Sequence, residues 1–140
     1  MILPKFEYRK AYTVEEALAL YNFYDERAVY LAGGTDLVPR LKLRLQKPVA
    51  VIDLKGIEEL HGLMEEREWV RVGALMTLQE LKEAEPVKEF YPTLKEALKA
   101  TSCETLQMRG TVGGNILQEA RCLFYNQSEF WRRAKGYCLK

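Results

Sequence analysis

The sequence contains few residues of the kinds that build disulfide frameworks, metal centres or membrane spans. Three cysteines and one histidine occur among 140 residues. The odd number and the wide spacing of the cysteines argue against a disulfide framework. Because the cysteines include no C-x-x-C pair, they do not have the spacing of a zinc site. No apolar stretch approaches the roughly 18 residues that a membrane-spanning helix requires, and the apolar run at the start is too short for a secretory signal. We therefore expect a cytoplasmic protein with no membrane partner, whose thiols are reduced or form part of a metal site.

An excess of charge of either sign is also missing. The 21 Lys and Arg residues nearly balance the 20 Asp and Glu residues, which leaves a net charge of +1. Because proteins that bind nucleic acids usually carry a clear basic excess, we expect no nucleic-acid partner. The content of 48% hydrophobic and 29% charged residues is typical of a folded globular chain. A chain of this length fits one domain or two small subdomains.

Strand and helix patterns alternate in the first part of the chain. A short alternation of apolar and polar residues occupies residues 6–8, and apolar runs of strand length occupy residues 28–32 and 49–52. Helical stripes occupy residues 13–21 and 37–45. The run at 49–52 is apolar on both alternating faces, as in a parallel strand that is covered on both sides. This order predicts a small parallel βαβαβ subdomain over residues 1–55.

The remaining residues, 56–140, have a different pattern. Two strand-like runs between residues 63 and 72 predict an antiparallel hairpin. The segments Thr77–Glu80 and Thr93–Glu96 have the spacing of capping boxes and predict two helices. After Ala100 no regular pattern continues. The fold class predicted for the whole chain is α+β, with the parallel subdomain followed by an α+β subdomain that contains antiparallel strands.

Two pairs of adjacent glycines are the best candidates for a binding site. The segment Ala32-Gly33-Gly34-Thr35-Asp36 lies between a predicted strand and a predicted helix. Glycine lets a ligand approach the backbone there, and the amides that follow favour an anion. The segment Thr111-Val112-Gly113-Gly114-Asn115 can form a turn with positive φ whose amides also face a phosphate. Each segment alone fits an ordinary turn equally well, but together they could converge on one ligand between the subdomains.

These two segments, with Ile52-Asp53-Leu54 and Val72-Gly73-Ala74 between them, carry a resemblance to a known family. In this order they resemble the FAD-binding medium subunit or domain of the molybdenum hydroxylases, the xanthine dehydrogenase family. The resemblance implies an FAD-binding oxidoreductase subunit in which both glycine turns hold the diphosphate. It implies no catalytic residue, because the flavin carries the redox chemistry. By position, the implied FAD-binding residues are Leu31, Ala32, Gly33, Gly34, Thr35, Asp36, Leu37, Thr111, Gly113, Gly114 and Asn115.

The resemblance also implies how the FAD is held and with which partners it exchanges electrons. The amides of Gly33, Gly34 and Thr35 would hold phosphate oxygens, and side chains of Thr111 and Asn115 would add hydrogen bonds from the other side. The implied partners are a small 2Fe–2S subunit and a large molybdopterin subunit. We further expect Gly33→Val or Gly114→Val to weaken FAD binding and to leave the fold intact.

The segment from about residue 120 resembles the β subunit of 4-hydroxybenzoyl-CoA reductase, in which an insertion carries a 4Fe–4S cluster. Cys122 and Cys138 match two of its cysteine ligands, and the other two are absent, so one copy of the chain cannot supply a complete set. Ordinary free thiols are the alternative, and Cys103, outside the insertion, is interpreted as a packing residue. This narrower resemblance implies reduction of an aromatic acyl-CoA on a partner chain.

Other features have structural interpretations. Flavin subunits of this family are longer than this chain, so the alternative function is a truncated, non-catalytic scaffold or partner-binding remnant that does not retain FAD. A homodimer would cover the surface that such a truncation exposes. His61 is interpreted as a surface or local packing residue. A group of basic residues is interpreted as a solvated helix face, although a few of these charges could instead meet an acidic partner or a nucleotide phosphate: Arg40, Lys42, Arg44 and Lys47.

Overall fold

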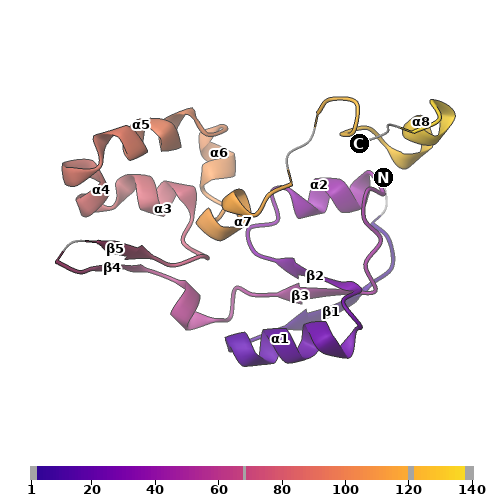
Figure 1. The fold of residues 1–140 in the computed structure, drawn as a ribbon, viewed down its shortest axis with the longest axis horizontal. Coiled ribbons are helices and arrows are strands. Elements are labelled where there is room, and N and C mark those ends of the chain that lie inside the picture. Colours follow the sequence, from indigo (N-terminus) through magenta and orange to yellow (C-terminus); the bar gives the residue numbers. More distant parts are fainter. Residues whose placement is uncertain (1–2, 68, 120–121, 138–140) are drawn as a thin grey trace.

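The computed structural model describes residues 3–67, 69–119 and 122–137. Its first part is a three-stranded parallel sheet with α1 on one face and α2 on the other (Figure 1). The elements are β1 (Glu7–Lys10), α1 (Val14–Phe23), β2 (Ala28–Leu31), α2 (Leu37–Lys42) and β3 (Ala50–Asp53). The strand order is β1-β3-β2, and both pairs are parallel. The predicted βαβαβ unit is therefore confirmed.

Burial explains why β3 occupies the centre of this sheet. All four of its residues are buried, as expected for a strand that is covered on both faces. Ala50 and Ile52 belong to a core cluster that also includes Ala17 of α1. Thr13 caps α1 by accepting a hydrogen bond from the Glu16 amide at 3.1 Å. The Glu16 carboxylate accepts from the amide of Tyr12 rather than from that of Thr13, so only half of the predicted capping box forms.

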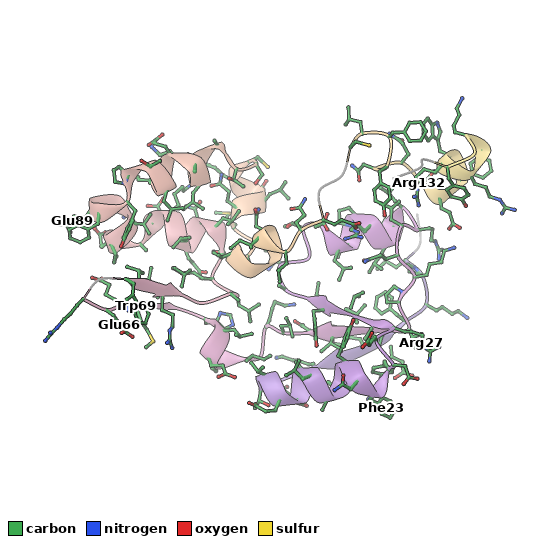
Figure 2. The ribbon with its side chains drawn as sticks, viewed as in Figure 1. Phe23, Arg27, Glu66, Trp69, Glu89 and Arg132 are labelled. Carbon is green, nitrogen blue, oxygen red and sulfur yellow. The ribbon has the colours of Figure 1, made fainter. Side chains whose placement is uncertain are left out.

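The second part contains an antiparallel hairpin and a group of short helices. A 3₁₀ turn, η1 (Glu58–Leu60), precedes β4 (Leu63–Glu65) and β5 (Val70–Val72), which pair as predicted. Figure 2 shows Glu66 and Trp69 at the tip of this hairpin. The helices are α3 (Leu78–Glu83), α4 (Glu85–Phe90), α5 (Pro92–Ala100), α6 (Glu104–Gln107), α7 (Val112–Ile116) and α8 (Glu129–Ala134). Parallel and antiparallel strands in one chain confirm the α+β class, whereas the boundary near residue 55 stays a prediction.

The helices of this second part differ from the expectation in several places. The box at Thr77 forms completely, with its partner Glu80. The box predicted at Thr93 is wrong, because α5 begins one residue earlier, at Pro92, and proline is favoured in the first helical turn. Pro86 occupies the first turn of α4, another position that favours proline. Helices α6, α7 and α8, which are four to six residues long, were not predicted.

The C-terminal segment lies beside α2 in Figure 1. The amide of Glu129, at the start of α8, donates to the carbonyl oxygen of Leu43 at 3.1 Å. The Glu129 carboxylate also forms an ion pair with Lys47 at 2.5 Å. Among the described residues, no helix is both long enough and apolar enough to cross a membrane.

Gln107 anchors the segment that leads from α5 to the second glycine turn. Its side-chain nitrogen donates to the carbonyl oxygens of Leu98, Thr101 and Ser102 at 3.0–3.2 Å. Its side-chain oxygen accepts from the ammonium of Lys82 at 2.9 Å, and both side chains are buried. Buried polar groups are costly unless they are paired, so this network fixes the path of residues 101–107.

We predict that Gln107→Leu lowers the free energy of unfolding by about 2–4 kcal/mol, because it leaves the buried ammonium of Lys82 and the carbonyl oxygens of Thr101 and Ser102 without their partner. The measurement is urea denaturation followed by circular dichroism. Gln118→Leu, at an exposed position, is the control and should change stability by less than about 0.5 kcal/mol. Equal stability of the Gln107 variant and the parent would contradict this role.

Candidate dinucleotide-binding cleft

Both glycine turns line one cleft of about 340 Å³. The first turn connects β2 to α2, and the second begins α7, which lies beside it in Figure 1. The cleft brings together ten of the eleven residues that sequence predicts. These are Ala32, Gly33, Gly34, Thr35, Asp36, Leu37, Thr111, Gly113, Gly114 and Asn115, whereas Leu31 does not line it.

The first turn depends on a close approach of two backbone segments. A Cβ atom at Gly33 would lie 1.7 Å from the carbonyl oxygen of Arg109. Gly34 has a φ of +76°, in the left-handed region that glycine adopts without strain. Glycine at these two positions is therefore required by the fold itself. The expectation that Gly33→Val leaves the fold intact is wrong, because the larger side chain would collide with the backbone at Arg109.

Three consecutive amides of this turn are available to a ligand. The N–H groups of Gly33, Gly34 and Thr35 have no acceptor among the residues that the structure describes. All three residues are partly exposed and line the cleft. Adjacent backbone N–H groups without partners form a concave site that attracts anions, phosphates in particular. The first turn therefore fits the predicted diphosphate site.

The second turn differs from the prediction. Gly113 and Gly114 belong to α7 and do not have positive φ, because Thr111 caps this helix through its hydroxyl oxygen. The amides from Val112 to Asn115 all donate within the chain, to Met76, Ala74 and Thr111, at 2.8–3.2 Å. They are consequently not free to hold a phosphate.

The second turn instead offers side chains and a close approach. The Asn115 side chain is exposed at the cleft and has no hydrogen-bond partner within the described residues. The absence of a side chain at Gly113 lets α7 approach Ala74, since a Cβ atom there would lie 2.9 Å from the Ala74 carbonyl oxygen. The two walls of the cleft therefore differ: one presents free amides and the other presents polar side chains.

Arg40 and Gln46 also line the cleft. Gln46 was not predicted to belong to the site, and Arg40 was expected near a phosphate only as the alternative to a solvated helix face. The Arg40 side chain is 12% exposed and forms ion pairs with Asp36 at 3.6 Å and Glu119 at 2.6 Å. Arg40 thus does not belong to a solvated helix face, whereas Lys42 and Arg44 are exposed as expected. The i,i+4 spacing of Asp36 and Arg40 is the sequence signal that could have found this pairing.

A buried carboxylate supports the start of the first turn. Asp53, at the end of β3, is 4% exposed and pairs with the Lys55 ammonium at 2.6 Å. Burial raises the pKa of the Asp53 carboxyl, but hydrogen bonds from Lys55 and Tyr8 outweigh burial and leave this pKa below its usual value. The same ammonium donates to the carbonyl oxygen of Ala32 at 3.4 Å. This brace connects the central strand to the residue that precedes the free amides.

The described residues do not assemble a metal site. No group of three or more His, Cys, Asp and Glu side chains that could hold a metal occurs within residues 3–67, 69–119 and 122–137. Cys122 is exposed, and its sulfur accepts from the Tyr125 amide at 3.4 Å, while Cys138 lies outside the described residues. Cys103 was interpreted as a packing residue but is exposed. His61 is also exposed, with a ring nitrogen 3.4 Å from the Lys55 carbonyl oxygen, in agreement with its surface interpretation.

Comparison with known proteins identifies the family. The sequence profile of the FAD binding domain in molybdopterin dehydrogenase matches residues 4–127. The chain belongs to this family. Among curated relatives of this FAD-binding family, the carbon monoxide dehydrogenase medium chain of Hydrogenophaga pseudoflava is 40% identical over 116 residues, 83% of this chain. The caffeine dehydrogenase subunit beta of a Pseudomonas species is 30% identical over 111 residues, 79% of this chain.

Solved structures of the molybdopterin dehydrogenase FAD-binding family share this fold. The carbon monoxide dehydrogenase structure from Hydrogenophaga pseudoflava superimposes with a TM-score of 0.80 over 83% of this chain. Quinoline 2-oxidoreductase from Pseudomonas putida 86 gives a TM-score of 0.77 over 81% of this chain at 31% identity. This chain spans about two fifths of the length of these relatives: 40% and 38% for the curated two, and 40% for both structures.

We predict that Gly33→Ala destabilises the protein even without a ligand, because the added Cβ atom would separate the first turn from the backbone at Arg109. Overpacking lowers the free energy of unfolding by about 1–3 kcal/mol. We expect a value at the upper end of this range, because the added atom would meet backbone rather than a side chain that can move. Gly62→Ala is the control: its Cβ atom meets nothing within 4 Å, so only the left-handed backbone costs about 1 kcal/mol. Urea unfolding of both variants measures the two losses of stability, and we expect the larger loss for Gly33→Ala. A smaller loss of stability for Gly33→Ala than for Gly62→Ala would contradict the close approach of the backbones.

Proposed function

We propose that this chain binds FAD in the cleft between the two glycine turns. The diphosphate lies on the amides of Gly33, Gly34 and Thr35, and Asn115 and Thr111 add hydrogen bonds from the opposite wall. The observation that carries the proposal is the row of three amides without internal acceptors, facing a cleft in an FAD-binding family. The residues present fit the group, because two adjacent glycines leave the backbone open to phosphate oxygens.

In this proposal the protein binds and orients the cofactor. FAD supplies the electron-transfer chemistry when it is bound, so no acid, base or nucleophile is needed from the chain. We further propose that the chain exchanges electrons with a 2Fe–2S subunit and a molybdopterin subunit. The names of the relatives support a multi-subunit assembly, since they include a "medium chain", a "subunit beta" and a nicotinate dehydrogenase "FAD-subunit".

The substrate proposal is narrower and has separate support. Reduction of an aromatic acyl-CoA, such as 4-hydroxybenzoyl-CoA, is supported by the sequence resemblance of the segment after residue 120. The relatives are named for other substrates, namely carbon monoxide, caffeine and nicotinate. Such variety is expected if the substrate reacts on a partner chain. A cluster on this chain is not part of the proposal.

We predict that Asn115→Ala weakens FAD binding by about 2–10-fold, the equivalent of one hydrogen bond, without a loss of stability. The reason is that its exposed side chain makes no hydrogen bond within the described part of the chain. The measurement is titration of the full chain with FAD, followed by flavin fluorescence. Asn22→Ala, at an exposed position of α1 outside the cleft, is the matched control and should bind like the parent.

Two outcomes would contradict the proposal. If the parent chain does not bind FAD at tens of micromolar, the alternative of a non-catalytic scaffold or partner-binding remnant is supported. If Asn115→Ala and Asn22→Ala bind equally well, the second wall does not contact the cofactor.

A further inference from the structure

A second cavity, of about 530 Å³, lies where α3, α5 and α6 pack together (Figure 1). It shares no lining residue with the cleft between the glycine turns. Two of its lining residues, Lys82 of α3 and Gln107 of α6, are buried, whereas residues 102–105 are exposed. The cavity therefore opens to solvent at residues 102–105 and reaches into the interior at Lys82.

Lys82 carries a charge that no carboxylate of the described chain compensates. Its side chain belongs to a residue that is 7% exposed, and its ammonium donates to the Gln107 side-chain oxygen at 2.9 Å. An ammonium has three N–H donors, and the described residues supply Lys82 with no second acceptor and no ion pair. The acids of its own helix are engaged elsewhere, since Glu80 caps α3 and Glu83 pairs with Lys88 at 3.5 Å. A buried charge is strongly unfavourable without an opposite charge, so this ammonium indicates an anion in the cavity.

The other charges around the cavity limit the charge of such an anion. Lys99 and Glu104 also line the cavity, and both are exposed. The Lys99 ammonium is paired with Glu96, which does not line the cavity, at 2.7 Å. Water and salt screen these exposed charges more than they screen the buried ammonium, so Lys82 dominates inside the cavity. The carboxylate of Glu104 repels a multiply charged group such as a phosphate, and a single negative charge fits best.

We propose that this cavity binds the carboxylate of a small, singly charged organic acid. The Lys82 ammonium supplies the opposite charge. The Ser102 hydroxyl, which lines the cavity and has no hydrogen-bond partner in the described part of the chain, donates to the same carboxylate. Gln107 is a positioning residue: its oxygen holds the ammonium, and its nitrogen is fixed by the carbonyl oxygens of Thr101 and Ser102 at 3.0 and 3.2 Å. The site is separate from the proposed FAD site, because the two cavities have no residue in common.

Cys103 provides a reporter for this site, because its exposed thiol lines the same cavity. Iodoacetate and iodoacetamide alkylate a thiolate in the same way: a bond forms between sulfur and the CH₂ carbon, the C–I bond breaks, and iodide leaves. The first reagent carries a carboxylate where the second carries a neutral amide. A hydrogen bond with the Thr105 hydroxyl, at 3.2 Å, lowers the pKa of the Cys103 thiol. This lowering favours both reagents equally, so the ratio of the two rates isolates the effect of the carboxylate.

The experiment measures alkylation of Cys103 in the full chain by mass spectrometry of its peptides, with 2-mercaptoethanol as the reference thiol. We expect the ratio of the iodoacetate rate to the iodoacetamide rate to be about tenfold higher at Cys103 than for the reference. The iodoacetate rate should saturate with concentration, because binding precedes the reaction. Acetate should slow the reaction of Cys103 with iodoacetate, whereas acetamide, its neutral counterpart, should not.

Two substitutions test whether Lys82 is responsible. Lys82→Met removes the charge and retains much of the apolar stem, so the rate ratio at Cys103 should fall to that of the reference thiol. Lys95→Met is the matched control, because Lys95 is a partly exposed lysine of α5 that does not line the cavity. This control should keep the ratio of the parent.

A ratio in the parent equal to that of 2-mercaptoethanol, or a raised ratio that survives in Lys82→Met, would overturn the carboxylate site. Equal protection of Cys103 by acetate and acetamide would also overturn it. The measurements on the parent need no variant, so the test holds even if Lys82→Met fails to fold. Titration of the parent with FAD is independent of these results, so a failure of the carboxylate site and a failure of FAD binding are distinguishable.

Discussion

The contact between Gly33 and the backbone at Arg109 determines where the site can form. With a Cβ position only 1.7 Å from the Arg109 carbonyl oxygen, no other residue fits at Gly33 without displacing one of the two segments. The segment at Arg109 leads directly to Gly110 and Thr111, where α7 begins. The missing side chain therefore brings the turn after β2 against the start of α7, although the two are far apart in sequence. A cleft between them follows from this packing.

The two walls of the cleft differ in which groups their internal hydrogen bonds leave available to a ligand. In α7 the helix cap and the contacts with Met76 and Ala74 use the amides, so only side chains of the second wall remain for the proposed binding. In the first turn the amides of Gly33, Gly34 and Thr35 have no acceptor among the described residues, so the proposed diphosphate is assigned to this wall. The brace from Asp53 through Lys55 to Ala32 holds the turn from behind. Rigid support of this kind is what a preorganised site needs.

Sequence reasoning predicted the parallel sheet and the hairpin, and ten of the eleven residues that it assigned to the ligand line the cleft. The sheet and the hairpin follow from local signals, namely apolar runs of strand length. The residues at the cleft come from the two glycine pairs and the family resemblance, and their role in binding stays a prediction. Sequence reasoning missed the features that depend on contacts between distant segments, namely the hydrogen bonds of α7 and the burial of Arg40. Nothing in the sequence near Gly113 indicates that Thr111 caps a helix. Nor does it indicate that the carbonyl oxygen of Ala74 accepts a hydrogen bond from the Gly113 amide. Arg40 has the local pattern of an exposed basic face, and its ion pair with Glu119 joins residues that are far apart in sequence and meet only in the folded chain.

The central claim is that the amides of Gly33, Gly34 and Thr35 bind the diphosphate, and amide chemical shifts in nuclear magnetic resonance test it directly. The account predicts that pyrophosphate moves the proton resonances of these three amides downfield and leaves those of Gly113 and Gly114, which already donate within the chain, nearly unchanged. Saturating pyrophosphate that leaves the Gly33, Gly34 and Thr35 resonances in place, or that shifts Gly113 and Gly114 instead, would contradict it.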